Sequence, residues 1–136
     1  MHLNKCLISA GSITHQINLP KTLMGFGGQE AEGIDDNLET NIIIFDFNDS
    51  KLLLISTDVL YIGKELKESI YNELKNTNKF GNNFSYDSII WAATHNHHAP
   101  SCDSSKQGLG KFDKNFFDLV FNDSINLIEK LINSNF

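Results

Sequence analysis

Arginine is absent from this 136-residue chain, and its 11 basic residues are all lysines. Lysine lacks the planar fork with which arginine binds phosphate or guanine in a bidentate manner. The 17 acidic residues bring the formal net charge to -6. Because nucleic-acid binding depends on positive charge that neutralises phosphates, we expect no nucleic-acid partner.

Long apolar runs are also missing. The longest, such as Ile42–Phe45 and Leu52–Ile55, are far shorter than the roughly 20 residues needed to cross a bilayer. The segment Met1–Lys5 shows no basic stretch leading into an apolar region, as a secretory signal would. We therefore expect no membrane span, no signal peptide in the chain as given, and a cytoplasmic setting by default.

Cysteine is scarce. Cys6 and Cys102 are the only two, too few and too far apart for a disulfide framework or a zinc knuckle, and we expect free thiols. The chain length suits one hydrophobic core. The sequence shows no repeat and no linker, so residues 1–136 are expected to form a single α/β domain.

What the chain does contain is a succession of strand and helix patterns. Apolar residues spaced by four along 62–75 and a longer apolar stripe from Asn115 onward predict two helices. Asp113 is the expected N-cap of the second helix. Runs rich in Ile, Leu and Phe predict strands at residues 6–14, 40–47, 52–57 and 88–93.

The order of these elements predicts the fold class. The turn composition of Asn48–Lys51 indicates an antiparallel hairpin between the second and third strands. The crossover through helix 62–75 would make the third and fourth strands parallel. We therefore expect an α/β fold: a mixed β-sheet with an antiparallel hairpin, a parallel βαβ crossover, and helices packed on the sheet. Residues 20–36, which hold four of the nine glycines, are expected to form a long functional loop.

Three of the five histidines, His95, His97 and His98, follow the fourth strand directly. Ligands of open α/β sheets bind at the carboxyl ends of strands. Because side chains alternate along a strand, His95 and His97 should share one side while His98 points to the other. The pattern predicts a metal or ligand site, although a histidine cluster can also simply terminate a strand with hydrogen bonds to the backbone.

Zinc needs three or four ligands, and this pair supplies two. Further candidates are Asp58, at the end of the preceding strand, then His15 and Asp103. An aspartate at position 58 is expected to orient a ligating imidazole or to cap the next helix rather than to ligate directly. His15 is expected to be a surface or packing histidine.

A strand followed by T-H-x-H also opens the metallo-β-lactamase site, whose pattern is T-H-x-H-x-D-H. Here Ala99 and Pro100 stand where that pattern needs its aspartate and its last histidine. The second metal position of that site cannot be built.

Ala93–Pro100 resembles the S-A-T-H-T-H-S-G-P segment of the neutral ceramidase family. Other segments resemble that family in the same order: Ala10–Thr14 its G-x-x-D-I-T strand, Leu23–Phe26 its M-M-G-Y turn, Gln29–Ile34 its Q-x-A-x-G-I, and Ile55–Asp58 its V-S-A-D strand end. Together they extend over nearly the whole chain, which would be the N-terminal part of a longer catalytic domain.

The resemblance implies a zinc-dependent hydrolase of acyl-amide bonds, with N-acylsphingosine or a related amide as substrate. His95 would ligate zinc, His97 would be catalytic and face the substrate, and Asp58 would steady the site. Gly25, Phe26 and Gly27 would form a substrate loop. Bound zinc would lower the pKa of a water molecule toward neutrality.

The departures are also specific. The family's R-L-x-A-R segment is Asn37–Asn41 here, and its further zinc ligands, a histidine, a glutamate and a tyrosine, come from segments beyond Phe136. Zinc is therefore expected to bind weakly or not at all to the isolated chain. The missing remainder of the domain, or a homo-oligomer, would be the partner. The alternative is a noncatalytic ligand-binding or interaction domain that keeps the fold.

Overall fold

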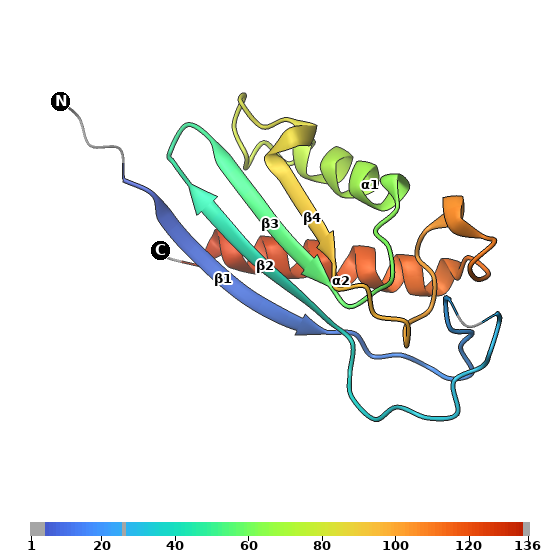
Figure 1. Ribbon diagram of the computed structural model, residues 1–136. Helices are drawn as coiled ribbons and strands as arrows, with labels where there is room; N and C mark the ends of the chain where they lie inside the picture. The colour runs from blue at the N-terminus through green and yellow to red at the C-terminus, as the bar shows by residue number, and fades with distance from the viewer. Residues whose placement is uncertain (1–4, 26, 135–136) are drawn as a thin grey trace.

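The computed structural model describes residues 5–25 and 27–134, which form one four-stranded sheet with its helices on one face (Figure 1). In chain order the elements are β1 (Leu7–Thr14), β2 (Glu39–Asp46), β3 (Lys51–Thr57), α1 (Lys64–Lys75), the 3-10 turn η1 (Tyr86–Ser88), β4 (Ile89–Ala93), the 3-10 turn η2 (Ser104–Lys106) and α2 (Lys114–Asn133).

The strands lie in the order β1-β2-β3-β4. β1 pairs antiparallel with β2, and β2 pairs antiparallel with β3. β3 and β4 are parallel, with Leu53 opposite Ile89 and Thr57 opposite Ala93. They run in the same direction because α1 carries the chain back to the end of the sheet at which β3 begins. The predicted fold class, a mixed α/β sheet with a hairpin and a parallel crossover, is confirmed.

Helix α2 begins where the sequence predicts, because the Asp113 carboxylate accepts a hydrogen bond from the Phe116 backbone N–H at 2.9 Å. Its apolar stripe is buried against the sheet, with Val120 and Ile128 fully covered. The stripe comes so close to β1 that a Cβ added at Gly11 would lie 3.1 Å from Leu127 Cδ1. The helix thus lies directly on the strand, and a larger residue at position 11 would require these leucine side chains to shift.

The core has two apolar clusters beneath one face of the sheet. The first contains Ile42, Ile44, Leu53 and Ile55, with Ile70 and Leu74 of α1 and the second half of α2. The second lies at the carboxyl ends of β3 and β4 and contains Leu38, Val59, Leu66, Cys102 and Phe116, among others. Trp91 packs against both clusters, so β4 connects them.

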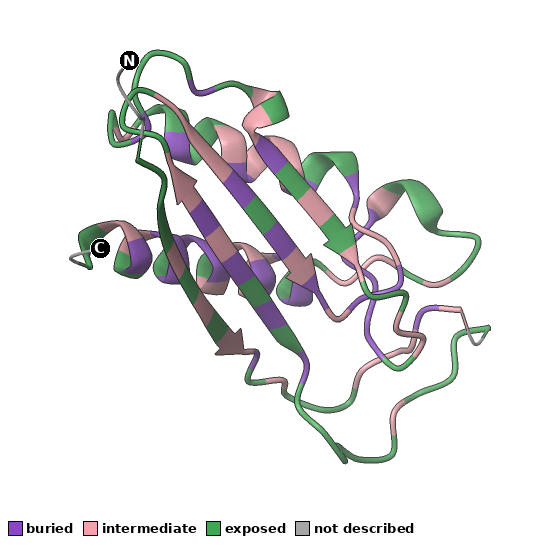
Figure 2. Cartoon of the chain, turned by 60° about the vertical axis from the view of Figure 1, so that its left-hand side comes forward, coloured by how far each residue is buried: buried purple, intermediate pink, exposed green. Residues whose placement is uncertain are grey.

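The opposite face of the sheet has no helix over it among the described residues (Figure 2). A sheet that meets water on one side normally places polar residues there. Here the side chains that alternate away from the helices are mostly apolar, and Ile8, Leu54 and Ile90 are 60%, 36% and 50% exposed. We call this the open sheet face: Ile8, Ala10, Ile43, Phe45, Leu52, Leu54, Ile90 and Ala92, with the polar Ser12, Asn41 and Ser56 at one end.

The long loop has more order than its composition predicts. An antiparallel bridge joins Thr22 and Glu30, and backbone hydrogen bonds join Leu23 to Gln29 and Ala31 to Lys21. These pairings close a small hairpin around the glycines at 25, 27 and 28, whose positive φ angles are those that glycine adopts without strain. None of the described helices is both long and apolar enough to cross a membrane.

Leu127→Ala should lower the free energy of unfolding by about 2–5 kcal/mol, since it removes a buried side chain that packs on β1. Asn126→Ala, on the exposed side of the same helical turn, is the control and should change it by less than about 0.5 kcal/mol. Urea denaturation of both variants measures the difference. Equal effects would show that the stripe does not hold the helix on the sheet.

The two thiols, both free, should differ in reactivity. Burial, followed by the nearby Asp103 carboxylate, raises the pKa of the Cys102 thiol to about 12, whereas Cys6 is exposed. Because the thiolate is the reactive form, one thiol per chain should react with a thiol-specific dye at pH 8, and two in denaturant. Cys6→Ser should abolish the native-state reaction. Rapid labelling of two thiols in the native state would contradict the burial of Cys102.

Candidate functional site

The histidine-rich segment leaves the sheet abruptly. β4 ends at Ala93, and His95 has φ 66°, in the left-handed region. A non-glycine residue there carries backbone strain of order 1–3 kcal/mol. The segment is nevertheless attached to β3, because Thr94 N–H donates to the Thr57 carbonyl at 3.1 Å and Asn96 N–H donates to the Val59 carbonyl at 3.0 Å. The expected alternation therefore stops at Ala93, and a kink sets the direction of the histidines.

The structure brings His95 and His97 together. Their ring centroids are 5.0 Å apart and the ring planes are nearly perpendicular. His95 Nδ1 lies 3.3 Å from the Leu60 carbonyl oxygen, and the Tyr61 ring meets the same imidazole edge-on. If Nδ1 donates to that carbonyl, the lone pair of His95 is on Nε2, which is the arrangement found in many metal-ligating histidines.

Gly25 is in contact with this histidine pair. A Cβ added there would lie 2.6 Å from His97 Nδ1, and φ is +90°, so a larger residue would displace the ring. The Gly25 N–H donates to the Leu109 carbonyl at 2.6 Å, which fixes the turn. Gly27, by contrast, is exposed and has no neighbour within 4 Å of its added Cβ. Phe26, the third residue of the predicted substrate loop, lies outside the described residues.

Asp58 connects neighbouring strand ends. Its Oδ2 accepts from the Glu39 backbone N–H at 3.0 Å, and its Oδ1 accepts from the Thr94 hydroxyl at 3.1 Å. Thr94 immediately precedes His95, so the carboxylate holds the start of the kinked segment. The Asp58 carboxylate thus binds the residue that precedes the histidines, and neither of these two hydrogen bonds is to an imidazole.

The described residues do not contain three or more His, Cys, Asp or Glu side chains grouped so that they could hold a metal ion. Among the residues that the structure describes, His95 and His97 therefore belong to no such group. The Asp103 carboxylate instead accepts two hydrogen bonds from Ser105, one from the Ser105 backbone N–H at 3.0 Å and one from the Ser105 hydroxyl at 2.6 Å. Two imidazoles supply at most two positions of a zinc site, so the described residues do not build a complete tetrahedral set.

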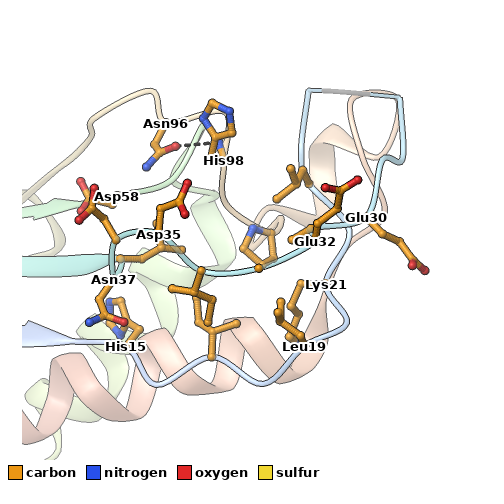
Figure 3. A pocket seen from close by; sticks show the side chains of 18 of the residues that line it. His15, Leu19, Lys21, Glu30, Glu32, Asp35, Asn37, Asp58, Asn96 and His98 are labelled. Atoms are coloured by element: carbon orange, nitrogen blue, oxygen red, sulfur yellow. Dashed lines mark hydrogen bonds between the residues drawn. The ribbon is translucent and has the colours of Figure 1, made fainter.

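A pocket of about 800 Å³ lies on the other side of the histidine segment, where His98 and Asn96 face the long loop (Figure 3). The Asn96 side-chain carbonyl holds the turn by accepting from the His98 N–H at 2.7 Å. Neither His95 nor His97 lines this pocket. The sequence predicts that His98 is separate from the pair, but not that the cavity lies on its side. Five carboxylates line the pocket: Glu30, Glu32, Asp35, Asp36 and Asp58.

His15 also lines the pocket, and it is neither a surface histidine nor a ligand in this arrangement. It is 1% exposed, and both ring nitrogens are hydrogen-bonded: Nδ1 to Asp123 Oδ2 at 2.8 Å and Nε2 to the Thr40 hydroxyl at 2.7 Å. The Thr40 hydroxyl lies 2.8 Å from that of Thr57, which accepts from Trp91 Nε1 at 2.9 Å. Sequence reasoning missed this chain of buried polar contacts.

Thr40, His15 and Asp123 are connected in the order hydroxyl, imidazole and carboxylate, as in a hydrolytic triad. Thr40 is fully buried, however, and its hydroxyl also contacts Thr57. A nucleophile must reach its substrate, so the arrangement is a structural network rather than a second active site.

No protein-family model matches the sequence, and a search of curated proteins finds no match either. The comparison of structures does find similar folds. The crystal structure of neutral ceramidase from Pseudomonas aeruginosa superposes with a TM-score of 0.76 over 91% of this chain, at 18% sequence identity. A ceramidase described as complexed with C2 gives the same TM-score and identity over 93% of this chain.

This chain spans 21% of the length of each of those two proteins. At such low identity the likeness establishes a shared fold only. The 136 residues thus have a ceramidase-like fold that corresponds to about one fifth of the solved ceramidase chains.

Proposed function

We propose that this chain is part of a ceramidase-like, zinc-dependent hydrolase that cleaves acyl-amide bonds, with His95 as a metal ligand and His97 as a catalytic residue. The observation that carries the proposal is the meeting of the two imidazoles at a strained kink after β4, within a fold shared with neutral ceramidase. Strained backbone persists where the surrounding structure and the function require it.

Zinc bound at such a site would supply a hydroxide nucleophile at neutral pH and polarise the amide carbonyl. The chain's own residues orient the imidazoles. The Leu60 carbonyl directs His95, Gly25 leaves room for the His97 ring, and Asp58 holds Thr94 and with it the start of the kink. His97 would then face the substrate and stabilise charge that develops on the carbonyl oxygen.

The remaining zinc ligands would come from outside these 136 residues, either from the rest of a longer domain or from a second chain. The similar ceramidase chains are more than four times as long. The carboxylates of the neighbouring pocket disfavour an anionic ligand there and are compatible with a neutral amide or an amine. A cytoplasmic setting remains our expectation.

The 136-residue chain alone should bind zinc weakly at pH 7.5, because two imidazoles leave two coordination positions to water. Binding should weaken further at pH 5.5, because imidazoles protonate near pH 6.5 and the protonated form cannot ligate. Calorimetric zinc titrations of the wild type, His95→Ala and the control His98→Ala measure this. His95→Ala should lose the binding and His98→Ala should retain it.

Two results would contradict the proposed site. Equal zinc affinity in wild type and His95→Ala would remove His95 from the ligand set. Binding that does not change between pH 7.5 and 5.5 would exclude histidine ligation altogether.

The open sheet face favours a second candidate function, that of a noncatalytic interaction domain. Eight apolar side chains of the four strands point away from the helices, and exposed apolar surface of this kind marks interaction sites. We propose that its occupant is a further layer of polypeptide from outside the 136 residues. The support is that the same fold occupies one fifth of the similar chains, which leaves ample polypeptide for such a layer.

The isolated chain should therefore be a monomer that binds a fluorescent hydrophobic dye, and Leu54→Lys with Ile90→Lys should reduce that fluorescence severalfold. Ile34→Lys is the control, since Ile34 is 48% exposed but lies in the long loop. Dye binding with analytical ultracentrifugation provides the measurement. A stable dimer that the double variant dissociates would make a second copy the occupant, and dye binding unaffected by the variant would contradict an open face.

A further inference from the structure

A series of hydrogen-bonded, mostly buried polar side chains beneath the sheet connects helix α2 with all four strands. It runs from Asp123 of α2 through His15, just after β1, to Thr40 of β2, Thr57 of β3 and Trp91 of β4. All four contacts are between 2.7 and 2.9 Å. Because His15, Thr40 and Thr57 are at most 1% exposed, water cannot replace these partners.

The donor at one end and the acceptor at the other constrain the protons between them. The Trp91 indole N–H can only donate, and an ionised Asp123 carboxylate can only accept. His15 Nδ1 must therefore carry a proton in both charge states of the imidazole. If His15 is neutral, its Nε2 is an acceptor, so the Thr40 hydroxyl donates to His15 and the Thr57 hydroxyl donates to Thr40.

If His15 is protonated, the hydrogen bonds between His15 and Thr40 and between Thr40 and Thr57 reverse their direction. The bonds to Asp123 and from Trp91 keep theirs. Nε2 then donates to Thr40, the Thr40 hydroxyl donates to Thr57, and the Thr57 oxygen accepts from both Thr40 and Trp91. Each hydroxyl has one donor and two acceptor positions, so each of the four contacts keeps one donor and one acceptor in both states. In the protonated state the Thr57 O–H has no acceptor among these four contacts.

We propose that the chain from Asp123 to Trp91 is a proton-sensitive relay, in which the protonation of His15 reverses the hydroxyls of Thr40 and Thr57. The indole hydrogen bond of Trp91 reports the state. In the neutral state the Thr57 hydroxyl donates onward, and a hydroxyl that donates is polarised into a stronger acceptor. Protonation removes that donation, so the Trp91 bond weakens.

His15 is among the residues that line the pocket, and its side chain has no exposed surface. Asp123 is the charged group that meets the imidazole from α2, and the ring of Phe116 covers it edge-on from the same helix with centroids 6.4 Å apart. The other titratable or charged groups around the pocket are Lys21, Glu30, Glu32, Asp35, Asp36, Asp58 and His98.

The relay is independent of the zinc proposal, since it involves neither His95 nor His97. Its position is nonetheless close to that site. Thr57 immediately precedes Asp58, and the Thr57 carbonyl accepts from the Thr94 N–H at 3.1 Å. The relay therefore ends one residue from the strand ends from which the histidine pair emerges.

Solution NMR of the intact chain tests the relay, because Trp91 is the only tryptophan and its indole N–H gives a single resonance. Neutral His15 should be the Nδ1–H tautomer by its ring ¹⁵N shifts. As the pH falls, the indole proton should move upfield with the same midpoint as the His15 ring. His15→Gln should abolish that step, whereas His95→Gln and His98→Gln should retain it.

Thr40→Val breaks the chain in the middle. His15 should still titrate in this variant while the indole resonance no longer follows it. If the variant does not fold, the tautomer and the two midpoints of the wild type decide alone. A neutral Nε2–H tautomer, or an indole step that persists unchanged in His15→Gln, would overturn the proposal.

Discussion

The parallel pairing of β3 with β4 is the constraint on which the site depends. The register that sets Thr57 opposite Ala93 makes both strands end at the same level, and hydrogen bonds from Thr94 and Asn96 continue the pairing after the strands end. The histidine segment is therefore anchored to β3 although it is no longer a strand. Because neighbouring parallel strands end at one edge, Asp58 and Thr94 meet there despite being 36 residues apart in the sequence.

The sequence predicts the fold well wherever burial is periodic. The apolar stripe of α2, the N-cap at Asp113 and the hairpin between β2 and β3 all occur within a residue or two of their expected positions, because these elements are fixed by local spacing. The hairpin within the long loop was not predicted, since its backbone hydrogen bonds involve positions with no apolar pattern. The apolar open sheet face was equally unexpected, because the strand runs alone do not say which of the two faces a helix covers.

The site is predictable in composition but not in shape. The clustering of His95 and His97 is visible in the sequence, whereas the left-handed φ of His95 and the contact of His97 with Gly25 arise from tertiary packing. The relay could not be found from the sequence, because its contacts join residues 17 to 108 positions apart. Threonines within strands and a single aspartate within a helix carry no local signal that they share a hydrogen-bonded chain.

Two independent features of the described residues are each incomplete without further polypeptide. The proposed zinc site would take two ligands from the histidine pair and would need more, and the sheet has an apolar face where a one-layer sheet in water would be polar. The first concerns chemistry and the second concerns packing, so neither explains the other. A further layer of polypeptide on the open sheet face would bring additional side chains to the strand ends that hold His95, because the face and the histidine segment share β3 and β4. The layer proposed for the open sheet face would therefore lie beside the strand ends at which the proposed zinc site is incomplete.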